Sequence, residues 1–220
     1  DQRLPVAAKM SSQGSYGTVA AALDLLQEAL NRGDTRLDIV RAGARSTILI
    51  HPVPGCIVRT QLVTSSRLNA FADDRYASVS TAIARFASDD AELAFIVGHE
   101  LAHGFLRHQA LLSDRHRSRS VFGRDEASSS LVLKTEKEAD YVALYMMARA
   151  GFDLGRIPDF LRRYGKASGA ILQFVKDHPS SRERVAAAEA TIVEIRGKQA
   201  RGEPLMPSLP RFVAEAAAPP

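Results

Sequence analysis

Two histidines and a glutamate in one short apolar segment have the types and spacing of a metal site. His99 and His103 stand four residues apart in "FIVGHELAHGF", residues 95–105, and Glu100 directly follows the first histidine. On a helix, positions i and i+4 share one face, so both imidazoles can reach a single point. This spacing lets one helix give two ligands to a tetrahedral zinc ion, with Glu100 beside the open position as a base.

A second acidic segment offers the further ligand that a catalytic zinc requires. Such an ion keeps three protein ligands and one water. The stretch "TEKEAD" contains Glu136 as the candidate ligand, and Asp140 one turn later can accept the Nδ1–H of a ligand histidine. The alternative is that His99 and Glu100 are only the polar side of a helix. The apolar residues 93–97 argue against it, because they predict a buried turn whose polar groups need partners.

The remaining histidines have weaker surroundings. His108 lies one turn beyond the motif, and we expect it at the surface rather than on the metal. His51 and His116 have no context that indicates a site. His178 stands directly before Pro179, in a predicted loop from which the chain can approach the metal from outside the two ligand helices.

Composition places the chain among ordinary globular proteins. It has 220 residues, of which 45% are hydrophobic, and Cys56 is its only cysteine, so we expect no internal disulfide. No apolar run approaches the roughly 20 residues that span a bilayer. The net charge of +4 raises nucleic acid or anionic lipid as partners, but much of the basic charge falls within residues 107–124, where a solvated loop is the simpler interpretation. Aromatic and basic residues do not interleave as in nucleic-acid stacking surfaces, so we expect no nucleic-acid partner.

Hydrophobic periodicity and end signals predict the elements that position these residues. Helices are predicted over residues 18–31, over 81–87, from the capping pair Asp89 and Glu92 through the histidine motif, from the "TEKEAD" segment to Gly151, from Pro158, and from the capping pair Ser180 and Glu183 to about Gln199. Strands are predicted as a hairpin turning at 42–45, in "CIVRTQLVTSS", and as two extended pieces of "RLNAFADDRYASVST". Residues 113–133 and the tail after Gly202 are predicted to be loops.

Taken together, the motifs resemble those of the gluzincin zinc metallopeptidases typified by HtpX, BepA and LoiP. The resemblance rests on "HELAH" followed by "EKEAD", on "LNAFA" at residues 68–72, on "HPSSRERV", and on "ADYVALYMMARAGFD", in which Ala143 stands where glycine is common. It covers roughly residues 60–200. It implies an α+β fold: a mainly helical zincin-type domain with a small antiparallel sheet.

The same resemblance implies roles for the site residues. The ligands of one Zn2+ would be His99, His103 and Glu136, with Glu100 as general base and Asp140 behind a ligand histidine. His178 would either stabilise the oxyanion or fill the open zinc position as a plug, and Arg184 would steady that loop or the oxyanion. An edge strand would hold an extended substrate through the backbone of Asn69, Ala70, Phe71 and Ala72.

The first residues do not belong to that peptidase pattern. Residues 1–58, a helix followed by strands, resemble the closing part of a PDZ domain, and the alternative is a local extension packed on the catalytic domain. The expected organisation is therefore a partial PDZ-like segment at 1–58, a zinc metallopeptidase domain at 59–200 and a loose tail at 201–220.

The function favoured by these features is a zinc-dependent endopeptidase. Its substrates would be polypeptides, misfolded or belonging to the cell envelope, in an extracytoplasmic compartment with possible peripheral membrane association. The rivals are a binding module that holds chain termini, and a basic nucleic-acid binder with a structural metal. An open coordination position and an intact Glu100 disfavour a structural zinc, which normally has four protein ligands. The sequence leaves the oligomeric state open.

Overall fold

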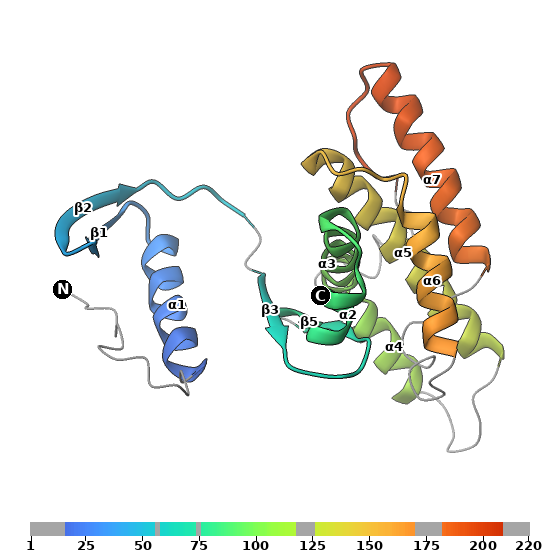
Figure 1. Cartoon of the computed structure of the whole chain (residues 1–220), viewed down its shortest axis with the longest axis horizontal. Helices are drawn as coiled ribbons and strands as arrows, with labels where there is room; N and C mark the ends of the chain where they lie inside the picture. Colours follow the sequence, from blue (N-terminus) through green and yellow to red (C-terminus); the bar gives the residue numbers. More distant parts are fainter. Residues whose placement is uncertain (1–15, 56–57, 74–75, 118–125, 170–181, 209–220) are drawn as a thin grey trace. The chain divides into compact units, whose positions relative to one another are not determined.

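The computed structural model divides into two compact units, Asp1–Cys56 and Ile57–Pro220. It describes residues 16–55, 58–73, 76–117, 126–169 and 182–208 (Figure 1). The architecture is mainly helical α+β with small sheets, as the sequence predicted.

The first unit contains a helix and a hairpin. Helix α1 (Tyr16–Asn31) leads into strands β1 (Thr35–Arg41) and β2 (Ala44–Ile50), which pair antiparallel with Arg41 opposite Ala44. The loop between them is therefore Ala42 and Gly43, whose φ angles of 48° and 81° are those of a type I′ turn. The predicted helix and hairpin are confirmed.

The second unit begins with a mixed sheet. Its strands β3 (Arg59–Val63), β4 (Ala70–Ala72) and β5 (Tyr76–Ser80) have the order β3-β5-β4. Strand β4 is antiparallel to β5, as expected for consecutive strands, but β3 is parallel to β5. The expectation of an antiparallel sheet is therefore wrong for β3. After β3 the chain forms β4 at the opposite edge of the sheet, and β5 then pairs between β3 and β4.

Helices form the rest of this unit, and they run longer than the sequence predicted at one point. They are α2 (Thr81–Phe86), α3 (Asp90–Phe105), α4 (His108–Arg117), α5 (Glu126–Ala150), α6 (Ile157–Gly169) and α7 (Arg182–Ala200). The loop predicted at residues 113–133 is wrong at both ends, since α4 runs to Arg117 and α5 starts at Glu126. Ser has a low helix propensity, but it is tolerated in α5 because this long helix continues into packed turns.

The predicted start of the motif helix is confirmed, with a small variation in its cap. The Asp89 carboxylate accepts from the backbone N–H of Glu92 at 2.9 Å, and the Glu92 carboxylate accepts from the N–H of Ser88 at 2.8 Å. Arg163 of α6 donates to the same Glu92 carboxylate. The cap thus also ties the start of α3 to α6.

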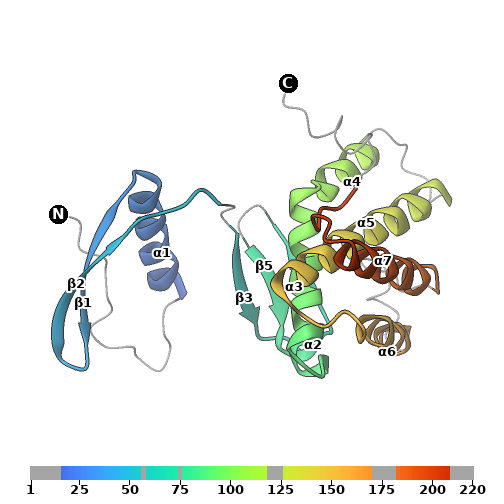
Figure 2. The ribbon, with the colours of Figure 1, turned by 90° about the horizontal axis from the view of Figure 1, so that it is seen from above.

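Helix α3 lies between the sheet and the helices α5 to α7, as the view in Figure 2 shows. It lies close to α5 at Gly98, where an added Cβ would lie 3.4 Å from the Cβ of Ala143. Around this point the core is built from fully buried side chains that include Phe95, Leu144 and Ile195. Two small residues therefore let the two predicted metal-binding helices approach closely.

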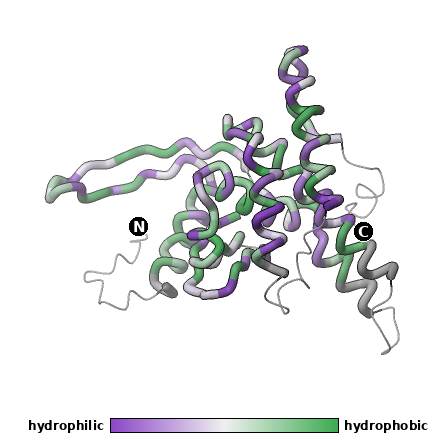
Figure 3. The backbone as a smooth tube through the Cα atoms, turned by 45° about the vertical axis from the view of Figure 1, so that its right-hand side comes forward, coloured by the Kyte–Doolittle hydropathy of each residue, from purple (hydrophilic) through white to green (hydrophobic). Residues whose placement is uncertain are grey.

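Across the described ranges, every helix is too short or too polar to span a bilayer. Figure 3 shows hydrophilic and hydrophobic residues interspersed along the coloured part of the tube.

Candidate metal centre

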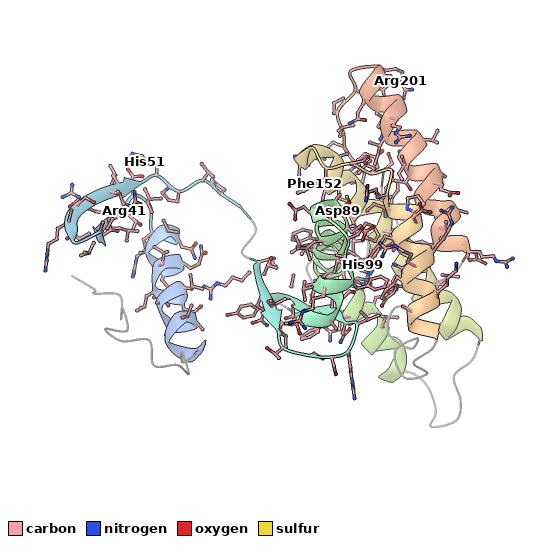
Figure 4. All side chains as sticks on the ribbon, in the orientation of Figure 1. Arg41, His51, Asp89, His99, Phe152 and Arg201 are labelled. Atoms are coloured by element: carbon pink, nitrogen blue, oxygen red, sulfur yellow. The ribbon has the colours of Figure 1, made fainter. Side chains whose placement is uncertain are left out.

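Helix α3 brings its two histidines together inside the second unit. The Nε2 atoms of His99 and His103 lie 3.0 Å apart, and the ring centroids lie 4.6 Å apart. Both His99 and Glu100 are buried, which confirms the burial predicted from the apolar residues before them. Figure 4 shows His99 in the interior, among the ribbons of α3 and its neighbours.

Helix α5 places Glu136 opposite this pair. One carboxylate oxygen, Oε2, lies 3.4 Å from His99 Nε2, and the other, Oε1, lies 3.3 Å from His103 Nε2. Ligand atoms of a tetrahedral zinc ion with bonds of about 2.0–2.1 Å lie about 3.3 Å from one another. The three side chains therefore fit such an ion, and they form the metal-type cluster found among the described residues.

Asp140, one turn after Glu136, holds the ring of His99 from behind. Its Oδ1 lies 2.9 Å from His99 Nδ1. A carboxylate accepts, so this contact keeps a proton on Nδ1 and leaves the Nε2 lone pair directed at the cluster. The arrangement is the one expected from the spacing of the "TEKEAD" segment.

Arg184 of α7 joins the two carboxylates of α5. Its Nε and Nη2 donate to the Asp140 carboxylate at 2.7 and 2.8 Å, and its Nη1 lies 2.9 Å from Oε2 of Glu136. The guanidinium is 3% exposed. The sequence singled out Arg184 as a residue that would steady the His178 loop or the oxyanion, and the structure places it as the buried counter-ion of Glu136 and Asp140.

The charges of this cluster shift the ionisation of its members. Burial opposes ionisation of Asp140, but Arg184 and the hydrogen bond from His99 offset it and hold the pKa of this carboxyl below its usual range. Burial likewise opposes the charge of His99, yet Glu136 and Asp140 raise the pKa of this imidazole to about 10. In the metal-free site the two carboxylates thus favour a positive charge at His99, a place that a metal cation can take over from the proton.

Glu100 borders a small apolar hollow beside the cluster. The hollow measures about 30 Å³, and Glu100 and Arg184 line it together with Ala70, Ile83, Phe95 and Phe160. It therefore connects the metal-type cluster to strand β4, which contributes Ala70.

Strand β4 is the end strand of its sheet among the described residues. The backbone of Asn69 and of Asp73 bonds to β5, through Ser80 N–H to Asn69 O at 2.8 Å and Asp73 N–H to Tyr76 O at 2.9 Å. Since antiparallel pairing alternates, the intervening N–H and C=O groups of Ala70 and Ala72 point away from β5. The side chain of Phe71 is 46% exposed.

The prediction that His108 lies at the surface is wrong. His108, expected at the surface, is 1% exposed, and its Nδ1 lies 3.0 Å from Nδ1 of His103. Burial lowers the pKa of His108 to about 3, and burial raises the pKa of Glu138, whose Oε2 lies 3.3 Å from His108 Nε2. The sequence contains a signal for this contact, because His108 follows His103 by five residues and a helix ends between them. His178 lies outside the described residues.

Comparisons with a family model and with known proteins point to the same family of peptidases. Residues 51–122 match the model of peptidase family M48. The chain is 29% identical over 134 residues to the mitochondrial metalloendopeptidase OMA1 of Arabidopsis thaliana, an alignment covering 53% of this chain and 28% of that protein. It is 31% identical over 131 residues to OMA1 of Schizosaccharomyces pombe, covering 49% of this chain and 38% of that protein.

A bacterial protein is also similar to this chain. The beta-barrel assembly-enhancing protease of Escherichia coli K12 is 23% identical over 167 residues, covering 61% of this chain and 34% of that protein. The chain therefore spans well under half the length of these relatives. The match at residues 51–122, these relatives and the His99, His103 and Glu136 cluster all point to peptidase family M48, whose members bind zinc.

Proposed function

We propose that this chain is a zinc-dependent endopeptidase that hydrolyses polypeptides. The observation that carries the proposal is the approach of His99 Nε2, His103 Nε2 and the two carboxylate oxygens of Glu136, at distances of 3.0, 3.4 and 3.3 Å that are near those between zinc ligands. Glu100 adjoins this triangle on the same helix. The relatives in plants and fission yeast are metalloendopeptidases by name, which supports the same reaction class.

The chain's own residues divide the work as follows. A zinc ion held by His99, His103 and Glu136 would supply a Lewis acid that polarises the scissile carbonyl and promotes ionisation of the attacking water. Glu100 takes the proton from that water and passes it to the leaving amine, a step typically worth about 10²–10⁴-fold in rate. Asp140 holds His99 in the tautomer that binds through Nε2.

Strand β4 would bind the substrate beside this centre. An extended peptide can add to its outer edge through the N–H and C=O groups of Ala70 and Ala72, with Asn69 and Phe71 flanking them. A side chain of that peptide would face the hollow next to Glu100, which Ala70 also lines. Because its walls include Ile83 and Phe95, a small apolar side chain fits it best.

The experiment that tests the proposal combines metal analysis with peptide cleavage. Wild-type protein should contain about one zinc per chain, and Glu136→Ala should lose it. Glu100→Gln should retain the zinc and lose cleavage by about 10²-fold or more. Glu203→Gln, in an exposed pair with Arg201, serves as the matched control for an acidic-to-amide change.

Two results would contradict the proposal. Full zinc occupancy in Glu136→Ala would remove Glu136 from the ligand set. Cleavage by Glu100→Gln at the rate of the Glu203→Gln control would show that Glu100 is not the base, or that the activity belongs to a contaminating protease.

His178 would act on the same centre in one of two ways. As an oxyanion stabiliser, its removal in His178→Ala should lower kcat by about 10²-fold or more. As a plug of the open coordination position, the same change should raise cleavage of a flexible substrate. We favour the plug, since a permanently open protease endangers its neighbours, and an unchanged rate would exclude both roles.

The first unit and the cellular location complete the proposal. Helix α1 and the β1–β2 hairpin would be the closing part of a PDZ-like module that binds chain ends, placed before a zincin-type catalytic domain. The substrates would be misfolded or envelope proteins in an extracytoplasmic compartment, by resemblance to the family members typified by BepA and LoiP.

A further inference from the structure

His108 is a buried histidine for which the proposed reaction has no use. It begins α4, is 1% exposed, and has its Nδ1 3.0 Å from Nδ1 of His103. The two rings meet edge to face, with centroids 4.9 Å apart and an angle of 78° between their planes. Burying an imidazole nitrogen without a hydrogen-bond partner costs free energy. The close contact between the Nδ1 atoms of His108 and His103 therefore requires an explanation.

The turn between α3 and α4 is what returns His108 to His103. Helix α3 ends where Leu106 N–H donates to Ala102 O at 2.9 Å. The next residue, Arg107, has a φ of 53°, and its N–H donates to Gly104 O at 3.1 Å. Non-glycine residues in this left-handed region are strained and persist where surrounding structure holds them. The backbone therefore accepts strain at the point that aims His108 at the cluster.

Metal binding by His103 dictates where the protons in this contact lie. Its Nε2 faces the cluster, at 3.0 Å from His99 Nε2, so a metal-bound His103 carries its proton on Nδ1. That proton points at His108 Nδ1, which must then accept. His108 is therefore neutral with its own proton on Nε2, and this Nε2 faces Glu138 Oε2 at 3.3 Å.

The far end of this chain of contacts is buried and incompletely bonded. Glu138 presents Oε2 to His108, and within the described residues neither His108 Nε2 nor Glu138 Oε1 has an aligned hydrogen bond. Glu138 therefore stands where it selects the Nε2–H tautomer of His108.

We propose that His108 is a positioning residue for His103, accepting its Nδ1–H and so directing its Nε2 at the metal, with Glu138 fixing the tautomer of His108. This inference rests on the proposed role of His103 as a zinc ligand. It gives the two ligand histidines different supports: His99 donates to the carboxylate of Asp140, which Arg184 neutralises, whereas His103 donates to an uncharged imidazole.

Zinc affinity, measured by competition with a chromophoric chelator, tests the proposal in matched variants. His108→Leu fills the space without an acceptor and should weaken zinc binding about 10–100-fold, the usual loss when a group behind a ligand is removed. His108→Asn places an amide oxygen near the position of Nδ1 and should restore most of that loss. His51→Asn, an exposed histidine of the first unit, controls for adventitious zinc binding.

Thermal unfolding of the metal-free variants separates positioning from simple packing. Removing a buried polar ring should leave the midpoint of metal-free His108→Leu unchanged or higher, while the zinc affinity falls. A variant that instead loses metal-free stability and is not rescued by asparagine would overturn the proposal. If His103→Ala itself binds zinc as tightly as wild type, the ligand assignment fails; if only His108→Leu does, the ligand assignment stands and the positioning role fails.

A second measurement needs no substitution and holds if a variant does not fold. Long-range 1H–15N NMR of the zinc-loaded wild-type protein reports the tautomer of each neutral histidine. His99 and His103 should carry the proton on Nδ1, and His108 should carry it on Nε2. A His108 with its proton on Nδ1, or on both nitrogens, would overturn the proposal.

Discussion

At the scale of single residues, Arg184 determines whether two buried carboxylates can share one site. Its guanidinium contacts both Glu136 and Asp140, and all three side chains are buried. Burial works against the charge of Arg184, but the two carboxylates raise the pKa of the guanidinium above its ordinary value. Removing one partner of such a group leaves an uncompensated buried charge.

We therefore predict that Arg184→Met lowers the free energy of unfolding of the metal-free protein by about 3 kcal/mol, measured in denaturant. Arg184→Lys keeps the charge but lacks the planar fork that contacts both carboxylates, so its loss should be smaller than that of Arg184→Met. Arg162→Met, at an exposed ion pair with Glu189, provides the control. Equal stability of the Arg184→Met and Arg162→Met proteins would contradict the counter-ion role.

The residue scale also shows where sequence reasoning succeeds. The spacing of His99 and His103 is a property of one helix, and so is that of Glu136 and Asp140, so both pairs could be read locally. The partners of Arg184 depend on how α7 packs against α5, which no local pattern contains. The burial of His108 depends on the left-handed backbone of Arg107, an arrangement that side-chain periodicity does not reveal.

At the scale of elements, the centre depends on the close approach of α3 and α5. Gly98 and Ala143 meet where an added Cβ would be 3.4 Å from its neighbour. We predict that Gly98→Ala binds zinc nearly as wild type does, because a Cβ at that distance makes ordinary contact. Gly98→Leu should weaken zinc binding and lower stability by about 1–3 kcal/mol, because extra atoms in a packed core force the helices apart.

Zinc competition measures the zinc affinity of the two Gly98 variants, and denaturant unfolding measures their stability. A Gly98→Leu protein with wild-type zinc affinity would mean that the spacing of α3 and α5 does not limit the ligand geometry.

Strand β4 leads to a separate prediction about substrate. Proline at Ala70 or Ala72 removes an N–H that points away from β5, so at least one of the two variants should raise KM for peptide cleavage while zinc content stays unchanged. Proline at Phe71 is the contrasting change, because its N–H faces β5 and its loss should reduce stability instead. If neither outward proline affects cleavage, β4 does not bind substrate.

The elements were predicted more accurately than their pairing. Helix ends at Asp89 and Gly151 follow from a side-chain cap and a left-handed glycine, which are local signals. The parallel pairing of β3 with β5 is not local, since it needs β4 to cross to the other side of β5. The loop predicted from composition at residues 113–133 is wrong at both ends. Serine and arginine favour a loop only where tertiary packing does not determine the local structure.

At the scale of the whole molecule, the two units divide the proposed work. Every described residue of the metal-type cluster and of its supports belongs to the second unit. The family match begins at residue 51, close to the boundary after Cys56. Removing residues 1–50 thus leaves the matched segment intact while deleting α1 and the hairpin.

We predict that a chain without residues 1–50 binds zinc and cleaves a short peptide within about twofold of the full chain, since the described residues of the cluster all remain. If the first unit is a PDZ-like module, cleavage of a long unfolded polypeptide should lose efficiency through a higher KM, with kcat unchanged. Parallel kinetics on both substrates measure the difference. An equal loss on both substrates would mean that the first unit supports the catalytic unit directly, and no loss on either would remove its proposed role in holding chain ends.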